Sequence, residues 1–221
     1  MEFMANVPDG HYDIGIVDPE YGIKESAHRN FSRSKLTKTK NYRKTVWDAD
    51  IPKQEYFDEL FRVTKHQIIW GINYFVGKRN LNIGSGRIFW DKVNGDSNFS
   101  DGELAYSSFH HSTRMFRFMW NGMQQGKNIK EGHLMQGDKT KNQKRIHPTE
   151  KPTTLYSWLL KKYAKEGYKI LDTHGGSMSH AIACYDLDFN VYLDICEKDK
   201  IHFEDAKKRF EWHKRQLKLE L

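Results

Sequence analysis

Four consecutive residues, Asp18-Pro19-Glu20-Tyr21, place a carboxylate, a proline and an aromatic ring directly after the apolar run of residues 12–17. The Asp18 carboxylate can accept hydrogen bonds from an amino group. Pro19 fixes the turn, and its carbonyl can act as a second acceptor. The ring of Tyr21 offers a flat face on which a planar base could stack. These groups suit chemistry on the amino group of an aromatic base, although a plain strand-to-loop turn can have the same residues.

A second candidate site is the segment Ile170-Leu171-Asp172-Thr173-His174-Gly175-Gly176-Ser177, which predicts a strand, a glycine turn and a helix. Glycines let the backbone approach a ligand closely, and the amides at a helix N-terminus meet polar groups there. The next predicted strand ends at Glu197, where a carboxylate can accept hydrogen bonds from both hydroxyls of a ribose. A dinucleotide site usually has three spaced glycines, so it fits less well. An ordinary loop with a surface Glu197 is the other alternative.

The elements that must position these residues alternate along the chain. Apolar runs predict strands over 12–17, 67–71, 87–90, 114–120, 169–173 and 191–196. Helical patterns cover 52–64, 152–165, 177–187 and 201–217. Strands that alternate with helices predict an α/β fold with a mainly parallel sheet. Two long polar segments, 22–50 and 121–145, interrupt the pattern as loops.

Both loops are basic. The chain of 221 residues has a net charge of +7, and Lys and Arg dominate from Lys24 to Lys44, where Glu25 is the single acidic residue. Segment 121–151 is basic again. Two basic loops that flank a candidate site predict an anionic partner such as a nucleic acid, whereas a solvated loop is the simpler alternative.

Other classes of protein fit the sequence poorly. No apolar stretch approaches the roughly 18 residues of a membrane span, and no secretory signal is apparent, so we expect no membrane association. Cys184 and Cys196 lie in apolar elements, as free thiols of a cytoplasmic protein do. His110-His111 is an adjacent pair without the spacing of metal ligands, and we therefore expect no metal site.

With His147-Pro148-Thr149-Glu150-Lys151-Pro152, the two motifs make the chain resemble the amino-directed DNA methyltransferases, whose signature is Asp-Pro-Pro-Tyr. The order, with the catalytic motif before the cofactor motif, resembles their circularly permuted β class. The chain looks most similar to small phage or prophage adenine methyltransferases of the site-specific, restriction–modification type. The absence of a Pro-Cys dipeptide excludes their relatives that use a cysteine nucleophile on the ring carbon of cytosine.

The resemblance implies a Rossmann-like, S-adenosylmethionine-dependent fold. One domain would span 1–221, with a catalytic half (1–120) and a cofactor half (147–221). DNA-contacting loops would cover 24–50 and 121–146. The family has an edge strand before the segment that matches Glu2–Asp9, and we expect either that this strand is missing here or that the chain is a shortened version. We expect double-stranded DNA as the substrate, with the target base turned out of the duplex. We also expect a monomer or homodimer in the cytoplasm of a bacterial or phage-infected cell.

The resemblance also implies roles for individual residues. The catalytic residues would be Asp18, Pro19 and Tyr21. The contacts to S-adenosylmethionine would come from Thr149, Lys151, Asp172, His174, Gly175, Gly176, Ser177 and Glu197. The contacts to DNA would come from Asn73, Arg29, Arg33, Lys35, Lys38, Lys40 and Arg43.

The chain departs from the family's commonest pattern at three places. Glu20 stands where the family has proline, Thr173-His174 replaces Pro-Phe, and Met178 occupies a position that is often glycine. Tyr21 favours an adenine enzyme over a cytosine amino methyltransferase, which uses the same chemistry. A non-catalytic DNA-binding relative and an RNA adenine methyltransferase are further alternatives.

Overall fold

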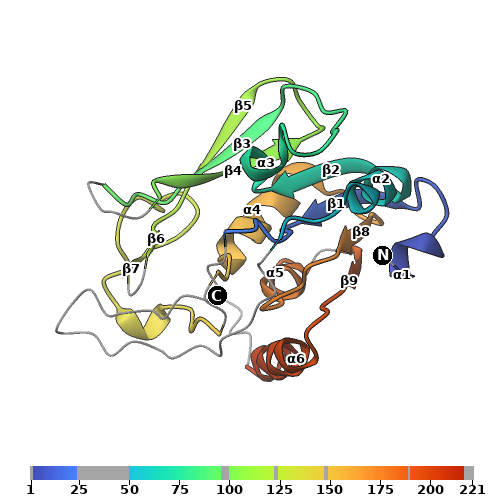
Figure 1. Ribbon diagram of the computed structural model, residues 1–221. Coiled ribbons are helices and arrows are strands. Elements are labelled where there is room, and N and C mark those ends of the chain that lie inside the picture. Colours follow the sequence, from blue (N-terminus) through green and yellow to red (C-terminus); the bar gives the residue numbers. More distant parts are fainter. Residues whose placement is uncertain are drawn as a thin grey trace.

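A seven-stranded sheet in the order β5-β3-β4-β2-β1-β8-β9 forms the centre of the computed structural model (Figure 1). The structure describes residues 2–23, 50–95, 100–121, 124–146, 149–188 and 190–216. The strands are β1 (Tyr12–Val17), β2 (Thr64–Trp70), β3 (Arg87–Asp91), β4 (Gly102–Ser107), β5 (Thr113–Arg117), β8 (Lys169–Asp172) and β9 (Tyr192–Ile195). A separate two-stranded sheet consists of β6 (Trp120–Asn121) and β7 (Gln124–Gln125).

Helices cover both faces of the large sheet. They are α1 (Glu2–Ala5), α2 (Gln54–Val63), α3 (Ile72–Phe75), α4 (Thr153–Tyr163), α5 (Ser179–Asp186) and α6 (Lys200–Lys214), with a short 3-10 helix η2 (Lys139–Lys141). In Figure 1, α4 and α5 lie on one side of the strands, and α2 and α3 lie on the other. The protein is therefore a three-layer α/β structure.

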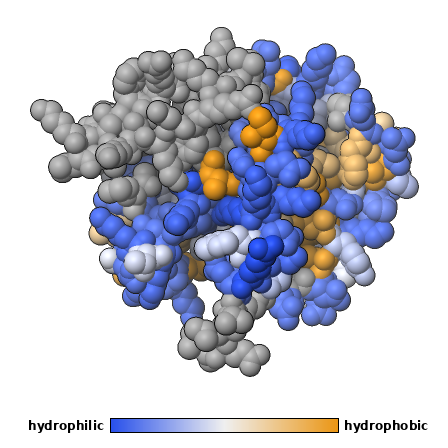
Figure 2. Space-filling model, turned by 90° about the horizontal axis from the view of Figure 1, so that it is seen from below, coloured by the Kyte–Doolittle hydropathy of each residue, from blue (hydrophilic) through white to orange (hydrophobic). Residues whose placement is uncertain are grey.

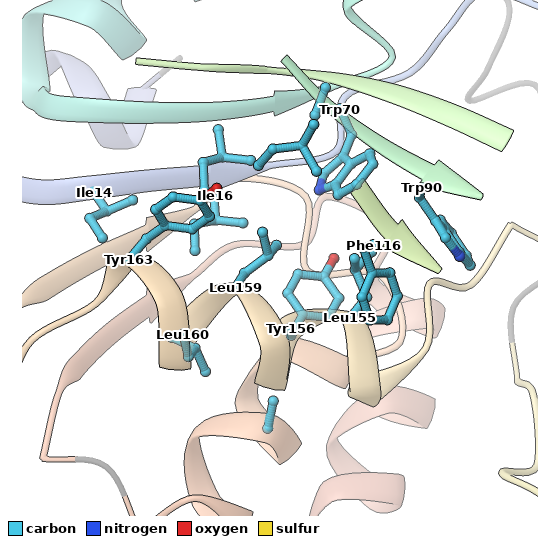
Figure 3. Packing of buried hydrophobic residues seen from close by; sticks show 14 of the residues in the cluster. Ile14, Ile16, Trp70, Trp90, Phe116, Leu155, Tyr156, Leu159, Leu160 and Tyr163 are labelled. Atoms are coloured by element: carbon cyan, nitrogen blue, oxygen red, sulfur yellow. The ribbon is translucent and has the colours of Figure 1, made fainter. Parts of the chain in front are cut away.

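The apolar run of β1 is buried because both faces of this central strand meet helices. Ile14 and Ile16 belong to the cluster that includes α4, and Val17 belongs to the cluster that includes α2. Figure 3 shows Leu155 and Leu159 between α4 and the strands that carry Ile16 and Trp70. Each fully buried side chain of this size contributes about 1.5–3 kcal/mol, an upper estimate for a compact unfolded chain.

The start of α4 fixes one important side chain. Pro152 precedes the first turn with φ −68°, the angle that a proline ring imposes. Leu155 and Leu159 follow at a spacing of four and anchor the helix to the sheet. Lys151, directly before Pro152, is therefore held against the protein interior and is 4% exposed.

The prediction of a mainly parallel sheet is confirmed, since β2, β1, β8 and β9 are parallel neighbours. Strand β4 runs antiparallel to both β2 and β3 and was not predicted from the sequence. Its glycine, glutamate and alanine break the apolar pattern that marks the other strands. The strand expected over 114–120 is two elements, because the ladder with β3 ends at Arg117 and Trp120 pairs with β7.

Strand β9 pairs with β8 alone in the part of the chain that the structure describes and so lies at one edge of the sheet. Cys184 and Cys196, which lie in apolar elements, are free thiols and are half-buried.

Within the described ranges, no helix combines the length and hydrophobicity that a membrane crossing requires. The described part also has no group of three or more His, Cys, Asp or Glu that could hold a metal ion. The coloured surface in Figure 2 is mostly hydrophilic, with small separate hydrophobic patches.

Candidate active site

The functional residues meet at one edge of the sheet because of the strand directions. The parallel strands β1, β8 and β9 lead to Asp18, Asp172 and Glu197 at their carboxyl ends. Strand β4 is antiparallel, so its first residues reach the same edge. The pairing of Trp90 with Glu103 sets their register, and Lys92 follows at the end of β3. Ligands of open α/β sheets bind at this carboxyl edge.

Asp18 lies in a cluster of charged side chains. Its Oδ1 atom accepts a hydrogen bond from the Tyr21 hydroxyl at 2.6 Å and forms an ion pair with Lys151 Nζ at 2.6 Å. Lys151 Nζ also lies 2.9 Å from Glu103 Oε2, and Lys92 binds the other oxygen of Glu103. The Asp18 and Glu103 side chains are each 20% exposed, so a substrate can reach the cluster.

The shared lysine gives the two carboxylates different acidities. Burial raises the pKa of Asp18, Lys151 lowers it, Glu103 raises it, and the net result lies above the ordinary value. Burial also raises the pKa of Glu103, but Lys151 and Lys92 outweigh it and bring this pKa to about 2. Burial lowers the pKa of Lys151, and the two carboxylates reverse this effect and raise it. Glu103 therefore stays ionised, and Asp18 is the more basic carboxylate.

An aromatic pair forms one wall of this site. The ring of Tyr21 stacks on Tyr74, with centroids 4.8 Å apart and an interplanar angle of 14°. Gly71 makes the approach possible, because a Cβ atom there would lie 2.1 Å from the Tyr21 ring and φ is +69°. Asn73, expected to contact DNA, is exposed on α3, and Tyr74 contacts the catalytic turn.

The glycine turn after β8 is organised by two carboxylates. Buried Asp172 accepts a hydrogen bond from the His174 amide at 3.0 Å and pairs with His180 at 3.1 Å. Glu197 accepts from the Gly176 amide at 2.9 Å through one oxygen and from the Asp199 amide at 2.8 Å through the other. The carboxylate of Glu197 thus lies across the turn, where the sequence predicted a hydrogen-bond acceptor for the hydroxyls of a ribose.

Three further residues complete this turn. A Cβ atom at Gly175 would lie 2.7 Å from Ile195, so only glycine fits against β9. The Ser177 hydroxyl is buried and contacts that of Ser179 at 2.9 Å. Met178 has φ +56°, the left-handed conformation that glycine adopts at low cost. This angle explains why a glycine is common at that position of the family pattern.

Two departures from the family pattern touch each other. His174 Nε2 lies 3.2 Å from Glu20 Oε2, and the Thr173 hydroxyl contacts His174 Nδ1 at 2.9 Å. The Tyr56 hydroxyl contacts Thr173 at 2.7 Å. Burial lowers the pKa of His174, but Glu20 outweighs burial, and the net pKa of His174 is raised. Burial raises the pKa of Glu20, but His174 outweighs burial, and the net pKa of Glu20 lies below its ordinary value. The pair joins the catalytic turn to the glycine turn.

A pocket of about 450 Å³ opens beside this pair. It lies between the turns after β1, β8 and β9 and the start of α2. Its lining residues are Glu20, Pro52, Lys53, Glu55, Tyr56, His174 and Lys198. Thr149, expected to contact the cofactor, is exposed, and Lys151 contacts Asp18 and Glu103.

The proposed DNA-contacting residues Arg29, Arg33, Lys35, Lys38, Lys40 and Arg43 lie outside the described residues. In the second basic loop, the side chains of five lysines are exposed: Lys127, Lys130, Lys139, Lys141 and Lys144. This loop leads directly to Lys151 and hence to the charged cluster. The buried Glu150 links its end to α6 through Arg209, at 3.2 Å.

The sequence did not indicate Glu103, Tyr74 or the role of Lys92. Glu103 is a single acid in a strand that lacks an apolar signature, and only the antiparallel register brings it to Asp18. Tyr74 follows Asn73, which the resemblance had already indicated as a DNA contact, so its aromatic ring was the available signal.

Comparisons with known proteins indicate the family and the fold of the chain. The family model described as DNA methylase matches residues 18–208. No curated protein matches the chain in sequence. Among solved structures, PvuII DNA methyltransferase (cytosine-N4-specific) gives a TM-score of 0.54 at 8% identity, over 100% of this chain and 84% of that chain. TTHA0409 from Thermus thermophilus, complexed with S-adenosyl-L-methionine, gives 0.50 at 14% identity, over 98% and 92%.

The family match spans most of the chain, and the chain therefore belongs to the DNA methylases. It is a DNA amino-methyltransferase of the permuted β class with S-adenosylmethionine as its methyl donor. The two solved structures share its fold.

Proposed function

We propose that the protein methylates the exocyclic amino group of adenine in double-stranded DNA, with Asp18 as the acceptor for that group. The observation that supports this best is the Asp18 carboxylate at the end of β1, partly exposed and beside the Tyr21–Tyr74 pair. A planar base fits an aromatic wall, and its amino group fits a carboxylate. The base must leave the duplex to reach them, since its amino group is paired there.

The residues around the catalytic turn have little acid–base chemistry to do. When bound, the donor supplies an activated methyl group on a sulfonium, and the sulfur keeps the bonding electron pair as a neutral thioether. Asp18 and the Pro19 carbonyl accept hydrogen bonds from the amine and hold its nitrogen in line with the methyl group. Asp18 also stabilises the positive charge that develops on this nitrogen, and the nitrogen then loses a proton to Asp18 or to water.

The pocket between the three turns fits the donor. Its volume of about 450 Å³ lies within the range of small-molecule sites. Glu197, Glu20 and Glu55 offer acceptors for hydroxyl and amino groups, and Lys53 and Lys198 offer donors for a carboxylate. Acidic residues also favour a cationic sulfonium. We propose that these residues, with Asp172, His174, Gly175, Gly176 and Ser177 of the turn, hold S-adenosylmethionine.

The five exposed lysines of the second basic loop are proposed phosphate contacts, together with the cations of residues 24–44. Replacing Lys139, Lys141 and Lys144 by glutamine should reduce the slope of log K against log salt by about 0.9 for each lost contact. The matched control is Lys207→Gln with Lys208→Gln on α6, both exposed. An unchanged slope in the loop variant, with donor binding intact, would assign the phosphate contacts to residues 24–44.

The function is tested by incubating the full chain with methyl-labelled donor and unmodified DNA, then identifying the labelled nucleoside. Label in N6-methyladenine is expected. Label in N4-methylcytosine would identify cytosine as the target base in place of adenine. The same carboxylate and aromatic wall could serve either base. Label in RNA but not in DNA would overturn DNA as the substrate. Binding of DNA without any transfer would make the chain a non-catalytic relative.

A further inference from the structure

Asp18 forms a charged network with three side chains that lie outside the catalytic motif. Lys151 comes from the residue pair before α4, Glu103 from β4 and Lys92 from the end of β3. The Lys151 side chain is 3% exposed, and its ammonium group bridges Asp18 and Glu103. Two carboxylates and two ammonium groups balance in charge, so the network can be buried.

The contacts to Asp18 fall on one oxygen. Tyr21 and Lys151 both bind Oδ1 in the described part of the chain, which leaves Oδ2 for the amino group of the substrate. The same ammonium group contacts the Tyr21 hydroxyl at 3.0 Å and lies over the Tyr21 ring, 5.4 Å from its centroid. Lys151 therefore fixes both the carboxylate and the aromatic ring of the catalytic turn.

An ammonium group so close to Asp18 also presents an electrostatic problem. Positive charge develops on the substrate nitrogen during methyl transfer, and the negative charge of Asp18 must stabilise it. Lys151 alone would cancel much of that negative charge. Glu103 shares the same ammonium group and offsets its charge, and Lys92 keeps Glu103 ionised.

We propose that Lys151 and Glu103 are positioning residues of the methyl-transfer site: Lys151 holds Asp18 and Tyr21 in place, and Glu103 limits how much of the lysine's charge Asp18 experiences. This inference rests on the proposed role of Asp18 as the acceptor of the target amine. Neither residue needs to touch the substrate.

The groups that face Asp18 determine how each change acts. On its own turn they are Glu20 and Tyr21. From other elements they are Tyr56 of α2, Glu103 of β4, Lys151 and Tyr156 at α4, and His174 after β8, with Lys92 acting through Glu103. Lys151 and Glu103 are the two charges that affect Asp18 most, and they act in opposite directions.

The test is the pH dependence of kcat/KM for methylation of unmodified DNA by the full chain. Activity requires ionised Asp18, so it falls as the pH drops through the raised pKa of this residue. This fall is the acidic limb of the pH profile. Lys151→Met should move the acidic limb upward by about 1 to 3 pH units, because Asp18 loses an opposite charge beside it. Glu103→Gln should move it downward and reduce kcat, because Lys151 then neutralises Asp18 alone.

Lys92→Met is the graded control. Without Lys92, Glu103 draws more of the Lys151 charge, and the acidic limb should move upward by less than in Lys151→Met. Donor affinity, measured by calorimetry, should stay the same in all three variants, because none of these residues lines the donor pocket. A circular dichroism spectrum and a melting curve check that each variant is folded.

Opposite shifts in Lys151→Met and Glu103→Gln support the proposal. Shifts in the same direction, or no shift in either variant, overturn it while the wild type remains active. If Lys151→Met does not fold, the opposite signs expected for Glu103→Gln and Lys92→Met decide in the same way. A wild type that transfers no methyl group to any nucleic acid would instead contradict the proposed function and leave Asp18 without the role assigned to it.

Discussion

The turns after β1 and β8 lie side by side, yet the protein builds them in different ways. The turn after β8 is held by local contacts, mainly backbone amides that donate to Asp172 and Glu197. The turn after β1 is held by the charged side chains of Glu103 and Lys151, which come from distant parts of the chain. The difference suggests that one turn binds a ligand that is always the same, and the other tunes a reacting group. Substitutions at five residues test that contrast.

Asp18→Asn should have the largest effect on activity. It keeps the size of the side chain but removes the charge that stabilises the substrate nitrogen, and turnover should fall about 100- to 1,000-fold. Donor affinity should not change. The measurement is single-turnover methylation together with calorimetry of donor binding, with Asp205→Asn on the exposed face of α6 as the control. Near-normal turnover in folded Asp18→Asn would remove Asp18 from the mechanism.

Glu197→Ala should affect the other turn selectively. Loss of hydrogen bonds to this charged group should weaken donor binding by about 1.5–3 kcal/mol, while the acidic limb of the pH profile stays where it is. The control is Glu204→Ala, a change of the same type at an exposed position of α6. Equal donor affinity in Glu197→Ala and in the wild type would show that the carboxylate only supports the Gly176 amide.

The Glu20–His174 pair links the two turns, so it should show coupling. Glu20→Pro and His174→Phe each restore one residue of the family pattern and leave the other partner unpaired. The double variant should therefore be more stable than the sum of the single changes predicts, by about 0.5–1 kcal/mol for this partly exposed pair. Simple additivity in chemical denaturation would mean that the two departures are independent.

The pair also predicts a pH dependence of this coupling. The pKa of His174 is raised in the folded state from its ordinary value of 6.5. With Glu20 ionised, the stabilisation is fully present below that ordinary value and is lost as the pH rises through the raised one. Denaturation at about pH 6 should show the coupling, and the coupling should disappear as the pH rises through the raised pKa of His174. The same coupling below and above that pKa would argue for packing rather than charge.

Met178 offers the most local test. Its left-handed backbone favours glycine, whereas its side chain is buried. Met178→Ala loses the side chain and keeps the strained backbone, and Met178→Gly loses the side chain but relieves the strain. Glycine should therefore be more stable than alanine here by about 1 kcal/mol. Greater stability of the alanine variant would indicate that the turn is not strained.

The sequence predicts the turn after β8 better than the turn after β1 for the same reason that they differ. Asp172, the glycine pair and Glu197 lie within one β-α-β unit, so spacing along the chain indicates their arrangement. Asp18 and Tyr21 were also identified from their local motif. Glu103 was not, because its position depends on β4, whose direction and register arise only when the whole sheet forms.

The same physical limit applies to the fold. Strands with continuous apolar runs, such as β1 and β8, were predicted close to their observed bounds. Strand β4 is stabilised by its neighbours on both sides rather than by its own sequence pattern, so periodicity does not indicate it. Lys151 was singled out for the donor site, and its burial against Asp18 follows from how α4 packs on the sheet.

The position of β1 at the centre of the sheet has a consequence for how the protein acquires its activity. Its partner β2 follows in the chain, but its partner β8 lies far away: Lys169 bonds Asp13 across 156 positions, and Lys151 reaches Tyr21 across 130. Contacts that close such long loops form slowly and late, because the entropy of closure must be overcome first. During refolding, helical signal should therefore return before methyl-transfer activity, and a nascent chain should remain inactive until its last third has been synthesised.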